Sequence, residues 1–180
     1  MPTPKPIQFH TTPDDHRIAA LAALAIGIHI IEAALPSPIP GVKPGLANVI
    51  TLFVLFRYGW KDAAWVSLLR VLAGSLLIGS FLTPTFMLSL SGACASLAAL
   101  GLLCRLNTHL PGQGLGAVGF SLIAAISHMT AQLVVARYLI IPHDGLFHLL
   151  PVLMTAAIIF GIVSGLITQS LLNHLDQQSA

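Results

Sequence analysis

The chain has 180 residues, of which 56% are hydrophobic and only 8% are Asp, Glu, Lys or Arg. A soluble domain averages about 25% charged residues, so this chain has too little charge to cover a water-exposed surface. Its net charge of +2 is too small to indicate a nucleic-acid partner. The composition therefore predicts an integral membrane protein that has no soluble domain of any size.

Polar segments flank one long apolar region. Residues 1–16 are polar and rich in proline, which predicts a cytoplasmic N-terminal tail rather than a cleavable signal peptide. Residues 17–173 are expected to form a single transmembrane helical domain. Residues 174–180 are expected to form a polar C-terminal tail.

Six apolar runs, separated by prolines or polar turns, make up the apolar region. A helix needs about 20 apolar residues to cross a bilayer. The expected spans are residues 18–35, 45–56, 63–81, 85–104, 115–141 and 146–172. The second run is short for a full crossing, so we expect it to start inside the membrane, to be tilted or to be partly re-entrant. The predicted fold class is an all-α polytopic membrane protein with about six transmembrane helices.

Lysine and arginine in the loops predict the orientation, because cytoplasmic loops carry an excess of both. With a cytoplasmic N-terminus, Lys43 is the basic residue that falls in an outer loop. The basic residues of the inner segments are then Lys5, Arg17, Arg57, Lys61 and Arg105. Both termini are therefore expected on the cytoplasmic side, which requires an even number of spans.

Two charged side chains are expected inside the membrane. Arg70 lies near the middle of the third expected span, and Glu32 lies near the far end of the first. A central arginine costs about 2.5–3.5 kcal/mol on insertion scales, so Arg70 should face the bundle interior and have a partner. Two interpretations stay open: a Glu32–Arg70 ion pair, or an Arg70 that faces a cavity and holds an anionic ligand.

The proline-rich segment after the first expected span places a basic residue before a helix N-terminus. Lys43 precedes Gly45, and Asn48 lies one turn into the second span. A helix N-terminus offers free N–H groups and partial positive charge, and glycine lets a ligand approach the backbone. These three residues could receive an anion or polar head from outside. An interfacial lysine and a helix-start asparagine without a ligand are the alternative.

Histidine occurs in two polar pairs at helical spacing. His128 and Gln132 are four residues apart in the fifth expected span, and His29 and Glu32 are three apart in the first. Residues at these spacings share one face of a helix. Each pair could line one polar cavity or make a hydrogen bond between helices.

Enzyme chemistry finds little support in the sequence. The chain has no P-loop, HExxH or GxSxG motif and none of the aspartate-rich motifs with which prenyl diphosphate synthases hold magnesium. Cys94 and Cys104 lie in apolar runs and form no CxxC motif, so we expect free thiols and no metal site. The chain is therefore expected not to be an enzyme and to carry no cofactor.

Small residues recur in the first expected span. Ala19 and Ala23 lie one helical turn apart. Small residues at this spacing let another helix approach closely, although alanine also simply fills membrane helices. The pair is thus a candidate docking face for a partner helix.

Four segments are similar to one bacterial family. Residues 35–49 (LPSPIPGVKPGLANV) resemble the loop-plus-helix signature of the Gx transporter family, also labelled heptaprenyl diphosphate synthase component I. Residues 67–79 (SLLRVLAGSLLIG), 84–92 (PTFMLSLSG) and 127–133 (SHMTAQL) match it too, and the similarity covers roughly residues 20–170. The usual loop has Lys-Leu-Gly where this chain has Lys43, Pro44 and Gly45, which stiffens the loop.

The resemblance implies a transport function. The family looks like the substrate-binding S-components of energy-coupling-factor transporters, which are six-helix bundles of the bacterial cytoplasmic (inner) membrane with both termini inside. Such proteins capture a vitamin-like small molecule between their outer loops and the bundle. By this likeness Ala19 and Ala23 would dock on a transmembrane coupling subunit that two cytoplasmic ATPases drive. The implied role is a subunit that binds a polar or anionic ligand for uptake.

The synthase label implies a different role. It suggests a non-catalytic membrane accessory subunit that pairs with a soluble prenyl synthase subunit, or that serves a membrane flavin or quinone redox assembly. Neither role names a ligand, because a likeness at the level of the fold does not define a site.

Overall fold

The computed structural model describes residues 12–34, 45–107 and 114–178, and these ranges contain helices and turns without a strand. The six α-helices are α1 (Pro13–Ala34), α2 (Ala47–Tyr58), α3 (Trp60–Ile78), α4 (Pro84–Asn107), α5 (Ala117–Val135) and α6 (Leu150–Gln178). A π-helical turn, η1 (Ala136–Ile140), extends α5, and a 3-10 helix, η2 (Asp144–Leu149), leads into α6. The predicted all-α fold class and its six helices are confirmed.

Four helical stretches are long and apolar enough to cross a membrane. They are Pro13–Ala34, Pro84–Asn107, Ala117–Ile140 and Asp144–Gln178. Helix α2 has 12 residues, which at 1.5 Å per residue gives about 18 Å, well short of a bilayer core of about 30 Å. Helix α3 has 19 residues but contains Lys61, Asp62 and Arg70. These features fit a membrane protein, and six full crossings stay a prediction.

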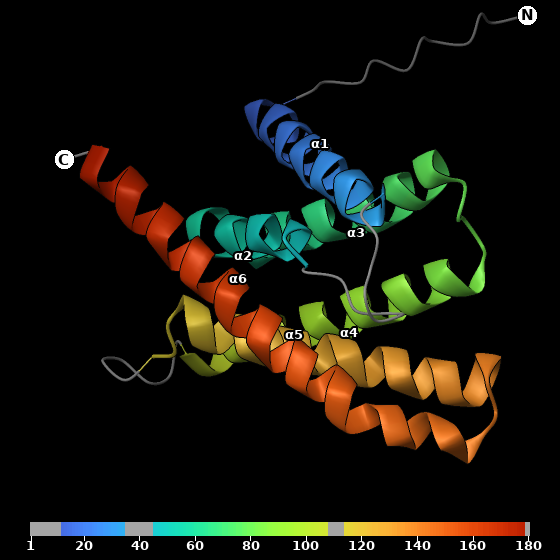
Figure 1. Cartoon of the computed structure of the whole chain (residues 1–180). Helices are drawn as coiled ribbons and strands as arrows, with labels where there is room; N and C mark the ends of the chain where they lie inside the picture. The colour runs from blue at the N-terminus through green and yellow to red at the C-terminus, as the bar shows by residue number, and fades with distance from the viewer. Residues whose placement is uncertain (1–11, 35–44, 108–113, 179–180) are drawn as a thin grey trace, which may run out of the picture.

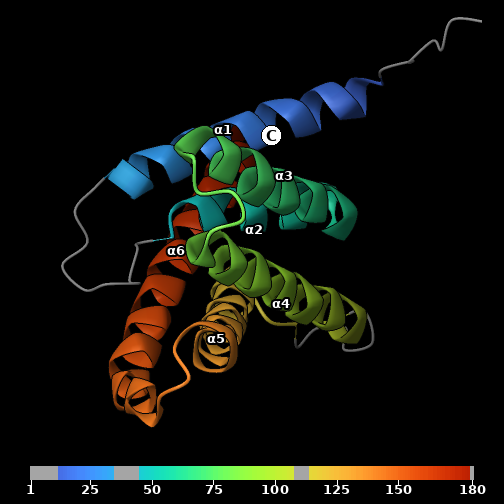
Figure 2. The same cartoon turned by 90° about the vertical axis from the view of Figure 1, so that its right-hand side faces the viewer.

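The helices form two groups. Helices α1, α2 and α3 pack together, and α4, α5 and α6 pack together (Figure 1). The groups meet where α3 packs on α4 and α2 packs on α6. In Figure 2, α1 and α3 lie above α4 and α5, and α6 runs along one side of both groups. We call α1–α3 the first half and α4–α6 the second half.

Small residues allow the closest packing of the second half. The Gly161-xxx-Gly165 pair of α6 faces α5, where a Cβ at Gly165 would lie 2.6 Å from Val118 Cα. Ser121 of α5 donates its hydroxyl to the Gly161 carbonyl at 2.7 Å. This GxxxG motif therefore serves a contact within the chain.

Ion pairs tie several helices together at one end of the bundle. Arg17 of α1 pairs with Asp62 of α3 at 3.0 Å, and Arg57 of α2 pairs with Asp176 of α6 at 3.4 Å. The start of α1 and the end of α6 therefore lie at the same end, as an even number of crossings requires. At Gly59, with φ at 101°, the chain turns from α2 directly into α3.

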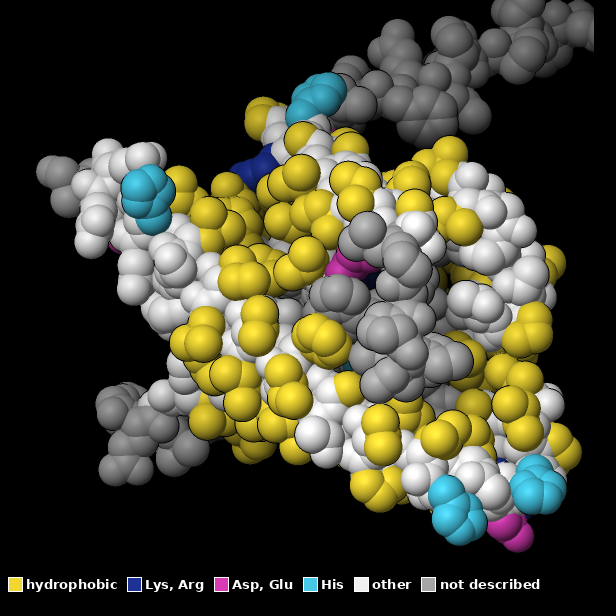
Figure 3. Space-filling model, viewed as in Figure 1, with side chains coloured by type: hydrophobic (Ala, Val, Ile, Leu, Met, Phe, Trp, Pro, Cys, Tyr) yellow, Lys and Arg dark blue, Asp and Glu magenta, His cyan; other side chains and the backbone are white. Residues whose placement is uncertain are grey.

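Apolar side chains cover much of the outer surface. Leu77 is 70% exposed, Leu139 is 66% exposed and Ile31 is 63% exposed. Figure 3 shows apolar side chains spread across the bundle, with most histidine and charged side chains near its ends. Large exposed apolar area suits contact with lipid tails and would be a liability in water.

Candidate functional site: a buried polar cavity between the two halves

A cavity of about 470 Å³ lies between the two halves, and all six helices contribute to its wall. Its volume falls within the roughly 300–1,000 Å³ of typical small-molecule sites. Gly45 at the start of α2, and Ser80 and Thr85 around the turn between α3 and α4, line it. The cavity therefore reaches toward the end of the bundle opposite the two termini.

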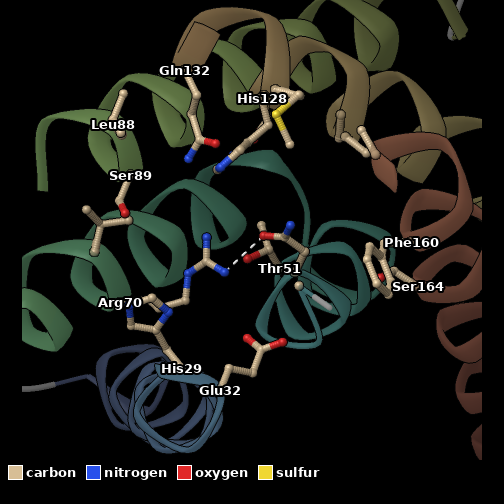
Figure 4. A pocket seen from close by; sticks show the side chains of 18 of the residues that line it. His29, Glu32, Thr51, Arg70, Leu88, Ser89, His128, Gln132, Phe160 and Ser164 are labelled. Atoms are coloured by element: carbon tan, nitrogen blue, oxygen red, sulfur yellow. Dashed lines mark hydrogen bonds between the residues drawn. The ribbon is translucent and has the colours of Figure 1, made fainter. Parts of the chain in front are cut away.

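Arg70 is a buried charge in this wall. The buried residues of α3 recur every three or four positions, from Ala63 through Val66 to Arg70 and Gly74, so helical geometry turns Arg70 inward. Arg70 as a whole residue is only 6% exposed. One guanidinium nitrogen, Nη1, donates to Asn48 Oδ1 of α2 at 2.9 Å, whereas the buried Nε has no hydrogen-bond partner among the described residues (Figure 4).

Glu32 is buried too, but it does not pair with Arg70. Its carboxylate accepts the backbone N–H of Leu46 at 2.6 Å and lies 3.5 Å from that of Ala47. These donors open α2, where the helix dipole favours a negative charge. No ion pair joins Glu32 to Arg70 in the described part of the chain, so the ion-pair interpretation does not describe the structure.

The opposite side of the cavity presents two polar side chains of α5. His128 and Gln132 point from α5 toward the Arg70 guanidinium (Figure 4). The His128 ring packs against the backbone of α4 at Gly92, where an added Cβ would lie 2.5 Å from Nε2. A side chain at this position would displace the ring. The other ring nitrogen, Nδ1, is buried without a hydrogen-bond partner among the described residues.

Hydroxyl groups complete the wall, and three of them donate their protons to backbone carbonyls. Ser75, Ser96 and Ser121 donate to carbonyls of Leu72, Ala93 and Gly161, respectively, so they offer the cavity their lone pairs. The buried hydroxyl of Thr51 lacks a partner among the described residues. Hence three side chains of this wall, Arg70, His128 and Thr51, keep an unpaired buried polar atom.

Most of the predicted ligand-binding residues converge on this cavity. Its lining includes His29, Glu32, Gly45, Asn48, Arg70, His128 and Gln132. Lys43 lies outside the described residues. Ala19 and Ala23 are exposed on the outer face of α1 and do not line the cavity. That these residues bind a ligand or a partner stays a prediction.

Sequence reasoning missed the hydroxyl-bearing part of the wall. Thr51, Ser89, Ser96, Ser121 and Ser164 line the cavity but are residue types common in membrane helices. The signal that could have indicated them is spacing, since Ser89 and Ser96 are seven residues apart on α4. Within the described ranges, no three His, Cys, Asp or Glu residues are placed to hold a metal ion.

Comparison with known proteins gives one match. The family model described as heptaprenyl diphosphate synthase component I matches residues 21–171, from the first turns of α1 to the last turns of α6. No curated protein and no solved structure matches the chain. Because the matched residues include every helix that lines the cavity, the cavity is part of the region that defines the family. The chain belongs to the heptaprenyl diphosphate synthase component I family.

Proposed function

We propose that this protein is a membrane subunit that captures a small polar or anionic molecule in the cavity for uptake, in the manner of a transporter S-component. The observation that carries the proposal is the buried Arg70, which lines a cavity of about 470 Å³ and makes no ion pair among the described residues. A buried charge without a close partner is costly. A bound ligand that accepts from the guanidinium would lower that cost.

The position of the cavity supports access from the outer side. The cavity reaches the end where α2 begins, opposite the end where Arg17 pairs with Asp62. The end where Arg17 pairs with Asp62 also holds Arg57, Lys61 and Arg105 at helix ends. This excess of basic residues favours a cytoplasmic location for that end. A molecule would thus enter from outside, near Gly45.

The outer face of α1 supports coupling to a partner helix. Ala19 and Ala23 are exposed there, while Ala22 and Ala25 of the same helix are buried against the bundle. Two small exposed residues one turn apart allow a second helix to approach closely. In this proposal that helix belongs to a transmembrane coupling subunit, and cytoplasmic ATPases supply the energy.

The family match favours a second candidate function. The family is described as a component of heptaprenyl diphosphate synthase, so the chain would be a non-catalytic membrane subunit bound to a soluble prenyl synthase subunit. A membrane flavin or quinone redox assembly is a variant of the same accessory role. Neither of these two accessory roles needs the unpaired polar atoms of the cavity.

Native mass spectrometry of the protein in mild detergent tests the proposal. We expect the wild type to retain a bound small molecule and Arg70→Ala to lose it while its helical circular dichroism is unchanged. Arg137→Ala is the matched control, because Arg137 pairs with Asp144 at 2.6 Å outside the cavity. A bare wild-type chain that copurifies with a prenyl synthase or redox subunit would favour the second candidate.

A further inference from the structure

We infer that the cavity accepts a ligand with a single negative charge, a carboxylate-type head group, and not a diphosphate or another polyanion. The inference rests on the proposed function and names the chemical class of its ligand. Three features carry it: the partners of Arg70, the partners of Glu32, and the charges along the rest of the wall.

Arg70 has a neutral hydrogen-bond partner and makes no ion pair among the described residues. Its partner Asn48 is an uncharged amide that accepts from Nη1 at 2.9 Å. The Asn48 contact fixes one side of the planar guanidinium, and His128 and Gln132 point toward the guanidinium from the opposite wall of the cavity (Figure 4). A guanidinium suits the planar oxygens of a carboxylate, so Arg70 can hold one carboxylate head.

Glu32 limits how much negative charge the cavity accepts. Its carboxylate is held by the backbone of Leu46 and lines the same cavity as Arg70. At this depth the charge of Glu32 is weakly screened and repels a second anion. Arg70 is the one cation that the described wall offers to a ligand carboxylate, so every further negative charge on the ligand would face Glu32 without a cationic partner there.

The remaining described wall offers no other cation. Arg70 is the one Lys or Arg among the described residues that line the cavity. Phosphoryl groups are usually held by several cationic groups or by magnesium on carboxylates. Here the described lining has one carboxylate, Glu32, and it is engaged with the start of α2. The described part of the wall therefore matches a diphosphate head poorly.

The rest of the cavity defines the body of the ligand. Phe86, Met129 and Phe160 provide apolar and aromatic surface, and Ser96 and Ser121 present acceptor lone pairs. His128 adds an unpaired ring nitrogen near the guanidinium (Figure 4). A compact, partly apolar acid with one or two hydrogen-bonding groups suits this wall.

Titration calorimetry of the purified protein with matched probes tests the inference. The probes are benzoate, 3-phenylpropionate and hexanoate, each paired with its primary amide, together with geranyl diphosphate and palmitate. We expect at least one acid to bind about tenfold or more tightly than its amide, because an interaction with a charged group contributes more than a neutral hydrogen bond. Palmitate that binds more tightly than the short acids would support the same head group and point to the bilayer as its source.

Asn48→Asp tests the role of charge without removing Arg70. The variant keeps the shape of the side chain and places a carboxylate at the atom that now accepts from Nη1. We expect binding of the acid to weaken about tenfold or more, while the affinity for the amide stays within about twofold. The control is Asp62→Asn, at the end of the bundle away from the cavity, which should change neither affinity.

The outcomes separate this inference from the proposed function. If the amides bind as tightly as the acids, if geranyl diphosphate binds more tightly than every acid, or if Asn48→Asp has no effect, the charge assignment is wrong and ligand capture stands. If no probe binds and the purified chain holds no small molecule, both fail.

Discussion

The two halves of the bundle face the same cavity with different chemistry. The first half supplies its charged groups, Glu32 and Arg70, together with Asn48. The described residues of the second half line it with hydroxyls, small and apolar residues, His128 and Gln132, and with no Asp, Glu, Lys or Arg. The expensive charges are thus confined to one half, where α1, α2 and α3 hold them in place. The second half supplies a neutral, closely packed wall.

This difference indicates that the two halves have different roles. In the first half, hydrogen bonds join Glu32 of α1 to the start of α2, and Asn48 of α2 to Arg70 of α3. Polar contacts therefore connect all three helices. In the second half, Gly161 and Gly165 let α5 and α6 touch at the backbone. Changes in the first half should therefore act mainly on ligand binding, and changes in the second half mainly on stability.

The largest expected effect is on ligand affinity in Arg70→Gln. Losing the charged partner of a buried anion costs about 2–5 kcal/mol, which corresponds to a decrease of about 30-fold or more. The free energy of unfolding should change little, because the variant loses the Asn48 hydrogen bond but also removes the desolvation cost of a buried charge that makes no ion pair among the described residues. Ligand titration and denaturant unfolding measure the two quantities. An equal loss in Arg137→Gln would show that the effect is not local to the cavity.

Gly165→Ala is expected to lower stability and to change ligand affinity little, which is the reverse of Arg70→Gln. The new Cβ would lie 2.6 Å from Val118 Cα, which is backbone and cannot rotate away. Overpacking of this kind costs about 1–3 kcal/mol of stability. Gly27→Ala is the matched control, because no atom lies within 4 Å of a Cβ there and alanine favours helix. Comparable thermal stability of the two variants would contradict the close α5–α6 contact.

Gly92→Ala should lower both ligand affinity and stability. The loss of affinity should be smaller than in Arg70→Gln, and the loss of stability smaller than in Gly165→Ala. The added methyl group would displace the His128 ring, whose Nε2 lies 2.5 Å from the new atom. A ring can rotate away, so we expect a stability cost of about 1 kcal/mol, at the low end for overpacking. Ligand affinity should fall severalfold because His128 moves. Full affinity in this variant would remove His128 from the site.

Glu32→Gln gives the smallest expected effect and a distinctive sign. The amide oxygen can still accept from Leu46 N–H, so the loss of the charge at the α2 N-terminus should cost at most about 1 kcal/mol of stability. Anion affinity should rise, by about fivefold if the repulsion removed is about 1 kcal/mol. Weaker anion binding in Glu32→Gln would mean that the carboxylate supports the ligand instead of repelling it.

Much of the fold could be predicted from the sequence because the membrane forces a simple pattern. Apolar runs bounded by proline indicated six helices, and the expected run 85–104 corresponds closely to α4 (Pro84–Asn107). Polar residues inside those runs pointed to one cavity, since hydrocarbon tolerates them poorly. Arg70 and His128 were found in this way, and the structure brings them to one wall.

The partners of these residues could not be predicted, because they depend on how the helices pack. With Glu32 as the one carboxylate in the expected spans and Arg70 near the middle of another, an ion pair was one expectation, but the Glu32 carboxylate accepts the backbone N–H of Leu46 at the start of α2 instead. The fit of the His128 ring against Gly92 likewise depends on the approach of α4 to α5. Thr51 gave no signal in the sequence, since an unpaired hydroxyl is a property of its surroundings.

The most direct test is an experimental structure of the protein in lipid nanodiscs with the molecule it carries from the cell. We expect density in the cavity with an anionic group at a hydrogen-bonding distance of about 2.7–2.9 Å from the Arg70 guanidinium. The body of the molecule should lie against the second half, near Phe160, with Glu32 still bound to the start of α2. A Glu32–Arg70 ion pair beside a cavity that holds only water or lipid tails would contradict the account.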